Sequence, residues 1–245
     1  MKNLKVKIVA LVLGTMSLVS CSSDDESSTL KPFYVAGMQE NISNNNYLAK
    51  HWNSEGTETI LSNDLFDIYI SSYYLNGNDI YTVGYENNVI DKGVCYKNGQ
   101  SVSVNLGTER SWFGDVFVLG NDVYISGSED SGGTQYAKVW KNGSSVTLNN
   151  NNNSYLNSVF VKNNEIFAVG QDLYSNTAKY WKNGVLETTI PNFVANKVFV
   201  EGNDVYITGM TASGSYRAAY WKNGTIITLE NTLSSKTFDI KIKDG

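Results

Sequence analysis

The sequence predicts an all-β protein built from five copies of one four-stranded unit, and three repeating columns of residues lead to this prediction. Self-similarity at a fixed period is the mark of a repeat architecture. An aromatic residue recurs at spacings of 44, 44, 41 and 40 residues: Trp52, Tyr96, Trp140, Trp181 and Trp221. Three positions before each of them lies a small residue: Ala49, Gly93, Ala137, Ala178 and Ala218. Further upstream, a glycine ends a short apolar run in every unit: Gly37, Gly84, Gly127, Gly170 and Gly209.

Each unit is expected to hold four short strands that are joined alternately by tight and by longer connections. In one clear example the strands cover residues 115–120, 123–127, 136–140 and 144–148. The turn after the third strand reads Lys-Asn-Gly in four units. Asn-Gly favours a type I′ hairpin, because both central residues of that turn need positive φ. Beyond the first twenty residues no helical periodicity is present.

Four antiparallel strands repeated about every 40–45 residues are typical of the blades of a β-propeller. The ends of the chain predict how the ring closes, because residues 33–37 align with the second strand of the unit and residues 238–245 with the first. Over residues 32–245 we therefore expect a five-bladed β-propeller of four-stranded blades. Pairing of the C-terminal strand with the N-terminal partial blade would close it and cover the exposed sheet edges.

The alternatives to a propeller are a β-sandwich and an open β-solenoid, but a sandwich would not need the same unit five times. The resemblance is to repeat-type β-propellers in general and covers essentially all of residues 32–245. It does not extend to a functional family, since the "GH…WD" pattern of WD repeats is missing. The repeats therefore predict a shape and leave the activity open.

Residues 1–20 have the pattern of a secretory signal peptide. Lys2, Lys5 and Lys7 form a basic start, and a mostly apolar, uncharged run follows from Ile8 to Val19. As a helix this run would rise about 18 Å, which is too short to span a hydrocarbon core ~30 Å thick. A cleaved leader is therefore favoured over a transmembrane helix.

The leader ends in "LVSC", and this ending resembles the lipobox of bacterial lipoproteins. The resemblance implies cleavage before Cys21 and attachment of a diacylglyceryl group to its thiol, with acyl chains such as palmitate anchoring the protein in a membrane. The next residues, "SSDDESS", are similar to the acidic export tag of surface-exposed Bacteroidetes-type lipoproteins. Residues 21–31 would then be the lipidated cysteine and an acidic tether on an outer membrane, facing the cell exterior. The alternatives are an ordinary cleavage site beside a chance cysteine, and a plain polar tether.

Composition argues against several classes of function. Without residues 1–20 the chain has 16 basic and 24 acidic residues, so it lacks the basic footprint of a nucleic-acid-binding protein. The same charge disfavours attraction to anionic lipid headgroups, which leaves the lipid as the link to the membrane. Cys95 is the one cysteine besides Cys21, so no disulfide framework can form within the chain. With His51 as its one histidine, the chain cannot build a zinc site from several His and Cys ligands. We expect no cofactor and no metal.

The repeated carboxylates and the single histidine do not suggest a catalytic centre. Four acidic residues recur beside the hairpin turns, and a role in forming those turns is enough to explain them: Asp79, Asp122, Glu165 and Asp204. A second column would begin the first strand and could ring a cation, although a structural role is favoured: Asp67, Asp115 and Asp239. His51 shares a third-strand column with Cys95, where packing is expected. No Ser-His-Asp arrangement can be argued around it, so no catalytic residue is assigned.

The long connections differ between units, and they are expected to emerge together on one face. Loops on a rigid scaffold are where binding residues concentrate. The candidate ligand-binding residues on this face are Arg110, Trp112, Tyr155, Asp172, Tyr174, Tyr216 and Arg217. The run Asn149–Asn153 is expected there as well. The alternative is a set of ordinary solvated loops.

The sequence thus predicts a lipid-anchored cell-surface protein that binds a glycan or a protein partner through the loop face of a β-propeller. A glycan-cleaving enzyme is an alternative and would need two carboxylates about 5–9.5 Å apart. A structural subunit of an envelope assembly is a third possibility. Binding is favoured over catalysis, and the sequence does not identify the ligand.

Overall fold

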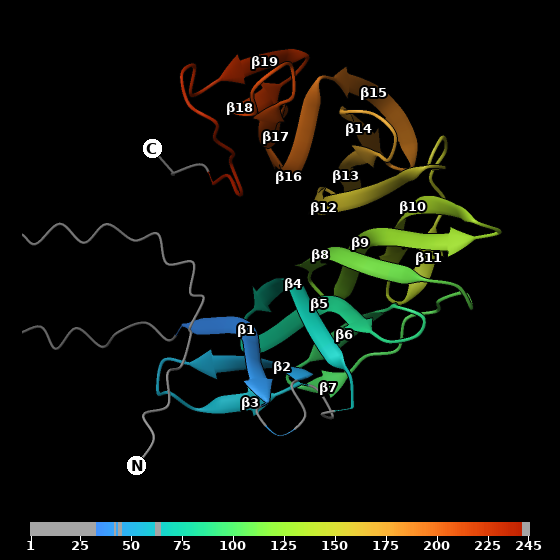
Figure 1. Ribbon diagram of the computed structural model, residues 1–245, viewed down its shortest axis with the longest axis vertical. Coiled ribbons are helices and arrows are strands. Elements are labelled where there is room, and N and C mark those ends of the chain that lie inside the picture. The colour runs from blue at the N-terminus through green and yellow to red at the C-terminus, as the bar shows by residue number, and fades with distance from the viewer. Residues whose placement is uncertain (1–32, 42, 44–45, 62–64, 242–245) are drawn as a thin grey trace, which may run out of the picture.

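The computed structural model describes residues 33–41, 43, 46–61 and 65–241, and these form an all-β, β-propeller-like fold in which no helix is present. They make one three-stranded and four four-stranded antiparallel sheets, each built from consecutive strands. Figure 1 shows the sheets following one another in an arc, in the order of the chain. The predicted all-β class and four-stranded repeat are confirmed. The leader, Cys21 and the tether lie outside the described residues.

The strands are short and fall into five sheets. Sheet A consists of β1 (Tyr34–Asn41), β2 (Asn46–Asn53) and β3 (Glu58–Ile60). Sheet B consists of β4 (Asp67–Asn76), β5 (Asp79–Asn87), β6 (Lys92–Lys97) and β7 (Gln100–Ser101). Sheet C consists of β8 (Ser111–Leu119), β9 (Asp122–Ser131), β10 (Thr134–Lys141) and β11 (Ser144–Val146). Sheet D consists of β12 (Ser154–Lys162), β13 (Glu165–Asp172), β14 (Thr177–Lys182) and β15 (Val185–Pro191). Sheet E consists of β16 (Phe193–Glu201), β17 (Asp204–Thr211), β18 (Arg217–Lys222) and β19 (Thr225–Thr228).

The first strands of sheets B to E pack against one another on the inside of the arc. One aromatic ring from each of these strands joins a continuous row: Tyr74, Phe117, Phe160 and Phe199. Neighbouring ring centroids in this row are 4.9–5.0 Å apart, within the range that aromatic pairs prefer. The repeat therefore brings equivalent side chains of successive sheets into direct contact.

The hydrophobic core lies between neighbouring sheets, and the repeated aromatic column is part of it. Trp140 and Trp181 are fully buried, and Trp221 is nearly so. Truncating a buried tryptophan to alanine typically costs ~3–5 kcal/mol, so this column carries a large share of the stability. The small-residue column is also explained, because a Cβ added at Gly93 would lie 2.8 Å from the ring of Phe113 in the next sheet.

The glycine column exists because the inner strand bends beside it. In each of sheets B to E the first strand contains a β-bulge, for example between Phe113 and Asp115. A Cβ at Gly127 would lie 2.0 Å from the Trp112 carbonyl oxygen, and Gly84, Gly170 and Gly209 are equally crowded by backbone. A bulge adds one residue to one strand and tightens the local twist. Glycine is therefore required for close approach of backbone.

The Lys-Asn-Gly turns have the predicted type I′ backbone, with positive φ at Asn98 and Gly99 and at their equivalents in sheets C to E. The lysine of each turn binds the acidic residue at the start of the second strand, and in sheets B, C and E the asparagine binds it as well. In sheet B, Lys97 Nζ lies 2.7 Å from Asp79, and Asn98 donates to the same carboxylate. These hydrogen bonds from lysine and asparagine hold the pKa values of Asp79, Asp122 and Asp204 below their usual range. The turn role predicted for this acidic column is confirmed, and we call this end of the sheets the turn face.

The predicted pairing of residues 238–245 with sheet A stays a prediction. Residues 236–241 form no strand, and residues 242–245 lie outside the described part. Thr237 instead contacts sheet E, where its N–H and hydroxyl donate to the Gly209 carbonyl at 3.3 and 2.8 Å.

Candidate functional site

The connections between sheets meet the hairpins between second and third strands at one end of each sheet, opposite the turn face. Three backbone hydrogen bonds of 2.7–2.8 Å join them: Asp130 to Arg110, Leu173 to Asn153, and Ala212 to Asn192. We define the loop face as residues 87–92, 105–112, 129–135, 149–155, 172–177, 191–193 and 211–217. The expectation that the long connections gather on one face agrees with this geometry.

All seven candidate binding residues lie on the loop face, but they are spread over four separate connections. Tyr174 and Tyr216 are 82% and 45% exposed, and Arg110 is exposed. The other four are half-buried: Trp112, Tyr155, Asp172 and Arg217. Among the hydrogen bonds, ion pairs and ring contacts of the described residues, one joins two of the seven, from the Tyr174 N–H to Asp172 Oδ1. The structure therefore brings the candidates to one face without forming one pocket from them.

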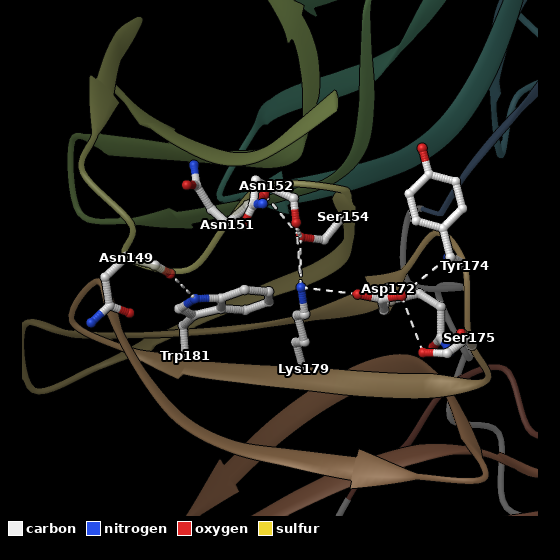
Figure 2. Close-up of polar contacts among 10 residues, drawn as sticks. Asn149, Asn151, Asn152, Ser154, Asp172, Tyr174, Ser175, Lys179 and Trp181 are labelled. Atoms are coloured by element: carbon white, nitrogen blue, oxygen red, sulfur yellow. Dashed lines mark hydrogen bonds and ion pairs between the residues drawn. The ribbon is translucent and has the colours of Figure 1, made fainter. Parts of the chain in front are cut away.

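The run Asn149–Asn153 connects sheet C to sheet D, and most of its residues form hydrogen bonds to other parts of the protein (Figure 2). Its first residue faces sheet D: the Asn149 carbonyl accepts from Trp181 Nε1 at 2.8 Å, and its side chain accepts from the Leu186 N–H. Its middle residue faces sheet C, where Asn151 exchanges two hydrogen bonds with Ala137. The run is a structural link between two sheets, and its end adjoins the loop face.

Lys179 joins this link to the predicted residue Asp172. Figure 2 shows its ammonium group between the Asn152–Ser154 backbone and the Asp172 carboxylate. Lys179 Nζ lies 3.3 Å from Ser154 Oγ and 3.2 Å from Asp172 Oδ2. Burial raises the pKa of Asp172, but hydrogen bonds from the Tyr174 N–H, Lys179 and Ser175 outweigh it, and the pKa is lowered overall. Much of the Asp172 carboxylate is thus engaged within the protein.

An equivalent acid–lysine pair in sheet C lines a cavity of about 400 Å³ on the loop face. Glu129 is 4% exposed, and it accepts from the Gly107 N–H and from Lys138. Lys138 pairs with Gly127 in the sheet just as Lys179 pairs with Gly170. The cavity is lined by Asn105, Leu106, Gly107, Thr108, Glu109, Glu129, Asp130, Ser131, Lys138 and Ser145.

Sequence reasoning did not select this cavity, although a signal for it was present. Two residues after the column glycine, three units carry an acid: Glu86, Glu129 and Asp172. In the last two of these units a lysine lies opposite the glycine. A paired acid and lysine repeated in two consecutive units would have pointed to the positions beside Arg110 and Tyr174.

A second polar cluster lies on the inside of the arc around Asp115, which is 1% exposed. Its carboxylate accepts hydrogen bonds from Ser72 Oγ at 2.7 Å and Ser158 Oγ at 2.9 Å. Lys197 Nζ lies 2.8 and 2.9 Å from its two oxygens. These four residues follow the bulge in β4, β8, β12 and β16, so one carboxylate ties four sheets together.

The predicted carboxylate column is wrong for Asp67. Asp67 pairs with Asn87 at the start of β4, whereas the β4 residue equivalent to Asp115 is Ser72. The cluster itself contains one carboxylate, while glycoside hydrolysis commonly uses two. Within the described part of the chain, no group of three or more His, Cys, Asp or Glu side chains is placed to hold a metal ion. No helix there is long and apolar enough to cross a membrane.

No protein-family model and no curated protein matches the chain. Among solved structures, the computationally designed protein Ika8 is similar with a TM-score of 0.51 at 15% identity. The match covers 81% of this chain and 62% of Ika8, so the chain spans less than two thirds of that protein. At this identity the likeness concerns the fold alone.

Two other solved structures give lower TM-scores. The designed protein Ika4 gives 0.43 at 16% identity, covering 66% of this chain and 96% of that one. A mutant of the Bombyx mori GH32 β-fructofuranosidase BmSUC1, in complex with sucrose, gives 0.44 at 10% identity, covering 80% and 59%. These two similarities are too low to support a statement about this chain.

The inner cluster generates a stability prediction. Asp115→Asn should lower the free energy of unfolding by about 3 kcal/mol, because it leaves Lys197 without a counter-charge. The estimate takes the lower end of the usual range, since the Lys197 side chain is 32% exposed. Urea unfolding followed by tryptophan fluorescence measures it. The double variant D115N/K197M should lose less than the two single variants together, and Asp122→Asn, which breaks an exposed pair, is the control. An equal loss in that control would contradict the prediction.

Proposed function

We propose that the protein is a lipid-anchored binding protein of the cell surface, which takes a glycan or a protein partner on its loop face. The observation that carries this proposal is the cavity of about 400 Å³ beside the predicted residue Arg110. The cavity is formed mainly by the connection that leads into β8 and by the β9–β10 hairpin, with Lys138 of β10 and Ser145 of β11 completing it. These segments differ from unit to unit on a scaffold that otherwise repeats.

The chemistry of this cavity suits a polar ligand. Carboxylate, carboxamide, hydroxyl and ammonium groups line it, so it offers both donors and acceptors. The buried Glu129 side chain in its lining is held in place by hydrogen bonds from Lys138 and the Gly107 N–H. Burial raises the pKa of Asp130, with Arg110 opposing and Glu109 adding to the shift. A ligand that donates a hydrogen bond to Asp130 would compensate this partly desolvated carboxylate.

The binding proposal predicts a hit on a glycan array probed with residues 22–245. Asp130→Asn should weaken that binding about tenfold, which corresponds to ~1.4 kcal/mol, because a charged acceptor becomes a carboxamide. Calorimetric titration with the hit glycan measures the change. Asp122→Asn, on the turn face, should bind like the wild type. If the array is blank and crosslinking on intact cells captures one partner, the ligand is a protein and not a glycan. If Asp130→Asn and Asp122→Asn lose affinity equally, the assignment of binding to the loop face is contradicted.

The anchor is proposed from the sequence around Cys21, which lies outside the described residues. Cells given an alkyne analogue of palmitate should label the wild-type protein and not Cys21→Ala, because that variant lacks the acceptor thiol. Protease added to intact cells should degrade the labelled protein if the tether places it outside. Equal labelling of both forms would overturn the anchor, and full protection from protease would overturn the outward orientation.

We also propose that the C-terminal segment supplies the strand that sheet A lacks. In sheet D, Asn157 of the β12 bulge donates to the Ala195 carbonyl on the first strand of the next sheet. The equivalent bulge residue in sheet E, Asn196, donates in the same way to the Thr237 carbonyl. This repeated contact supports the proposal that the segment around Thr237 takes the place of a first strand after sheet E. The open edge of sheet A is β1, which lacks this strand.

Closure predicts that the amide hydrogens of β1 exchange slowly only while residues 238–245 are present. Deleting these residues should speed exchange in β1, because its outer edge would lose its hydrogen-bond partner. Exchange in β12 and β13 should stay unchanged and serves as the internal control. Hydrogen exchange with mass spectrometry measures both regions in one experiment. Equal β1 protection with and without the segment would rule out closure by this strand.

A further inference from the structure

A second cavity, of about 240 Å³, lies between sheets A and B on the turn face, at the opposite end from the loop face. Its wall comes from β1, β2, β3 and the two turns of sheet B. The residues that line it are Tyr34, His51, Asn53, Thr57, Thr59, Asn78, Ile80 and Asn98. A water molecule takes up ~30 Å³ in the liquid, so the cavity has room for much more than one solvent molecule.

His51 is a buried residue of this cavity with an unmet hydrogen-bonding group. It is 5% exposed, and its Nε2, which is closed off from solvent, has no hydrogen-bond partner within the described residues. Buried polar groups in native proteins nearly always have a partner, and of the five buried side-chain atoms without one in the described residues, His51 Nε2 is the one whose residue lines a cavity. Burial lowers the pKa of His51, which keeps the imidazole neutral near neutral pH. The equivalent residues in the other sheets are Cys95, Val139, Tyr180 and Tyr220, so this imidazole occurs in one unit alone.

The walls on both sides of His51 are held in place by their own hydrogen bonds. Asn98 accepts from the Ile80 N–H at 2.8 Å and donates to Asp79 at 2.7 Å. Asn53 accepts from the Glu55 and Thr57 N–H groups at 3.0 and 2.9 Å. The cavity is therefore formed before any ligand arrives, which reduces the entropic cost of binding.

The chemistry of the lining identifies the class of ligand. All eight residues are uncharged at neutral pH, so an ion entering the cavity would be desolvated without a counter-charge from its lining. Hydroxyl and carboxamide groups both donate and accept hydrogen bonds, as the hydroxyl groups of a sugar do. Ile80 adds one apolar surface. We propose that this cavity is a second binding site, separate from the loop face, for one neutral sugar unit that packs beside the imidazole of His51.

The single histidine allows a direct test. In the mature, untagged protein labelled with [¹⁵N]histidine, the imidazole signals belong to His51 alone. D-glucose, D-galactose, D-mannose and N-acetyl-D-glucosamine are titrated separately into the millimolar range. The proposal expects saturable shifts of both imidazole nitrogens with at least one sugar. Absence of a saturable shift with all four would overturn it, since none of these sugars would then bind beside the imidazole.

Matched variants show whether the shift comes from this cavity. Asn78→Ala and Thr59→Val each remove a polar group from the lining and should raise the dissociation constant at least about tenfold. Asn121→Ala changes the same turn position in sheet C, outside this lining, and should leave it unchanged. Equal binding by Asn78→Ala, Thr59→Val and the wild type would also overturn the proposal. Asp130→Asn on the loop face should not affect the His51 signals, so this site and the proposed function can fail independently.

Discussion

The structure depends on one constraint: each small sheet is apolar on both faces and can bury them only against its neighbours. The clusters of buried residues accordingly lie between sheets, with Trp140 and Trp181 at no exposure. Close approach of the sheets explains the small residues before each tryptophan, and the bulge of the inner strand explains the column glycines. Because every unit meets the same constraint, the same residues recur, and recurrence alone says little about function.

Features that depend on local sequence could be predicted, and features that depend on register could not. Turn chemistry, the buried tryptophans and the four-stranded unit follow from short patterns such as Lys-Asn-Gly. The sequence suggested a ring that includes Asp115 but not which residues share it, because a bulge inserts one residue and moves those after it to the other face of the strand. That shift places Asp115 beside Ser158 and Lys197, whereas Asp67 lies before the β4 bulge, at the start of the strand and outside the cluster.

The same division applies to the candidate sites. The loop face could be predicted because alternating short and long connections must emerge at opposite ends of each sheet. Which loop residues remain available for a ligand could not, since Asp172 is engaged by Lys179 and Ser175 whereas Tyr174 is exposed. Nothing in the sequence indicated that His51 lines a cavity, because that follows from how sheet A packs on sheet B.

The asparagine run looks like a tract whose length drifts freely, yet its geometry argues the opposite. Asn149 hydrogen-bonds to sheet D, Asn151 hydrogen-bonds to sheet C, and Asn150 and Asn153 both adopt positive φ. Because these positions make different contacts or adopt different backbone conformations, inserting or deleting one asparagine would put the residues after it out of register with their partners. The length of the tract is therefore constrained by its hydrogen bonds, although any one asparagine in it is chemically identical to the next.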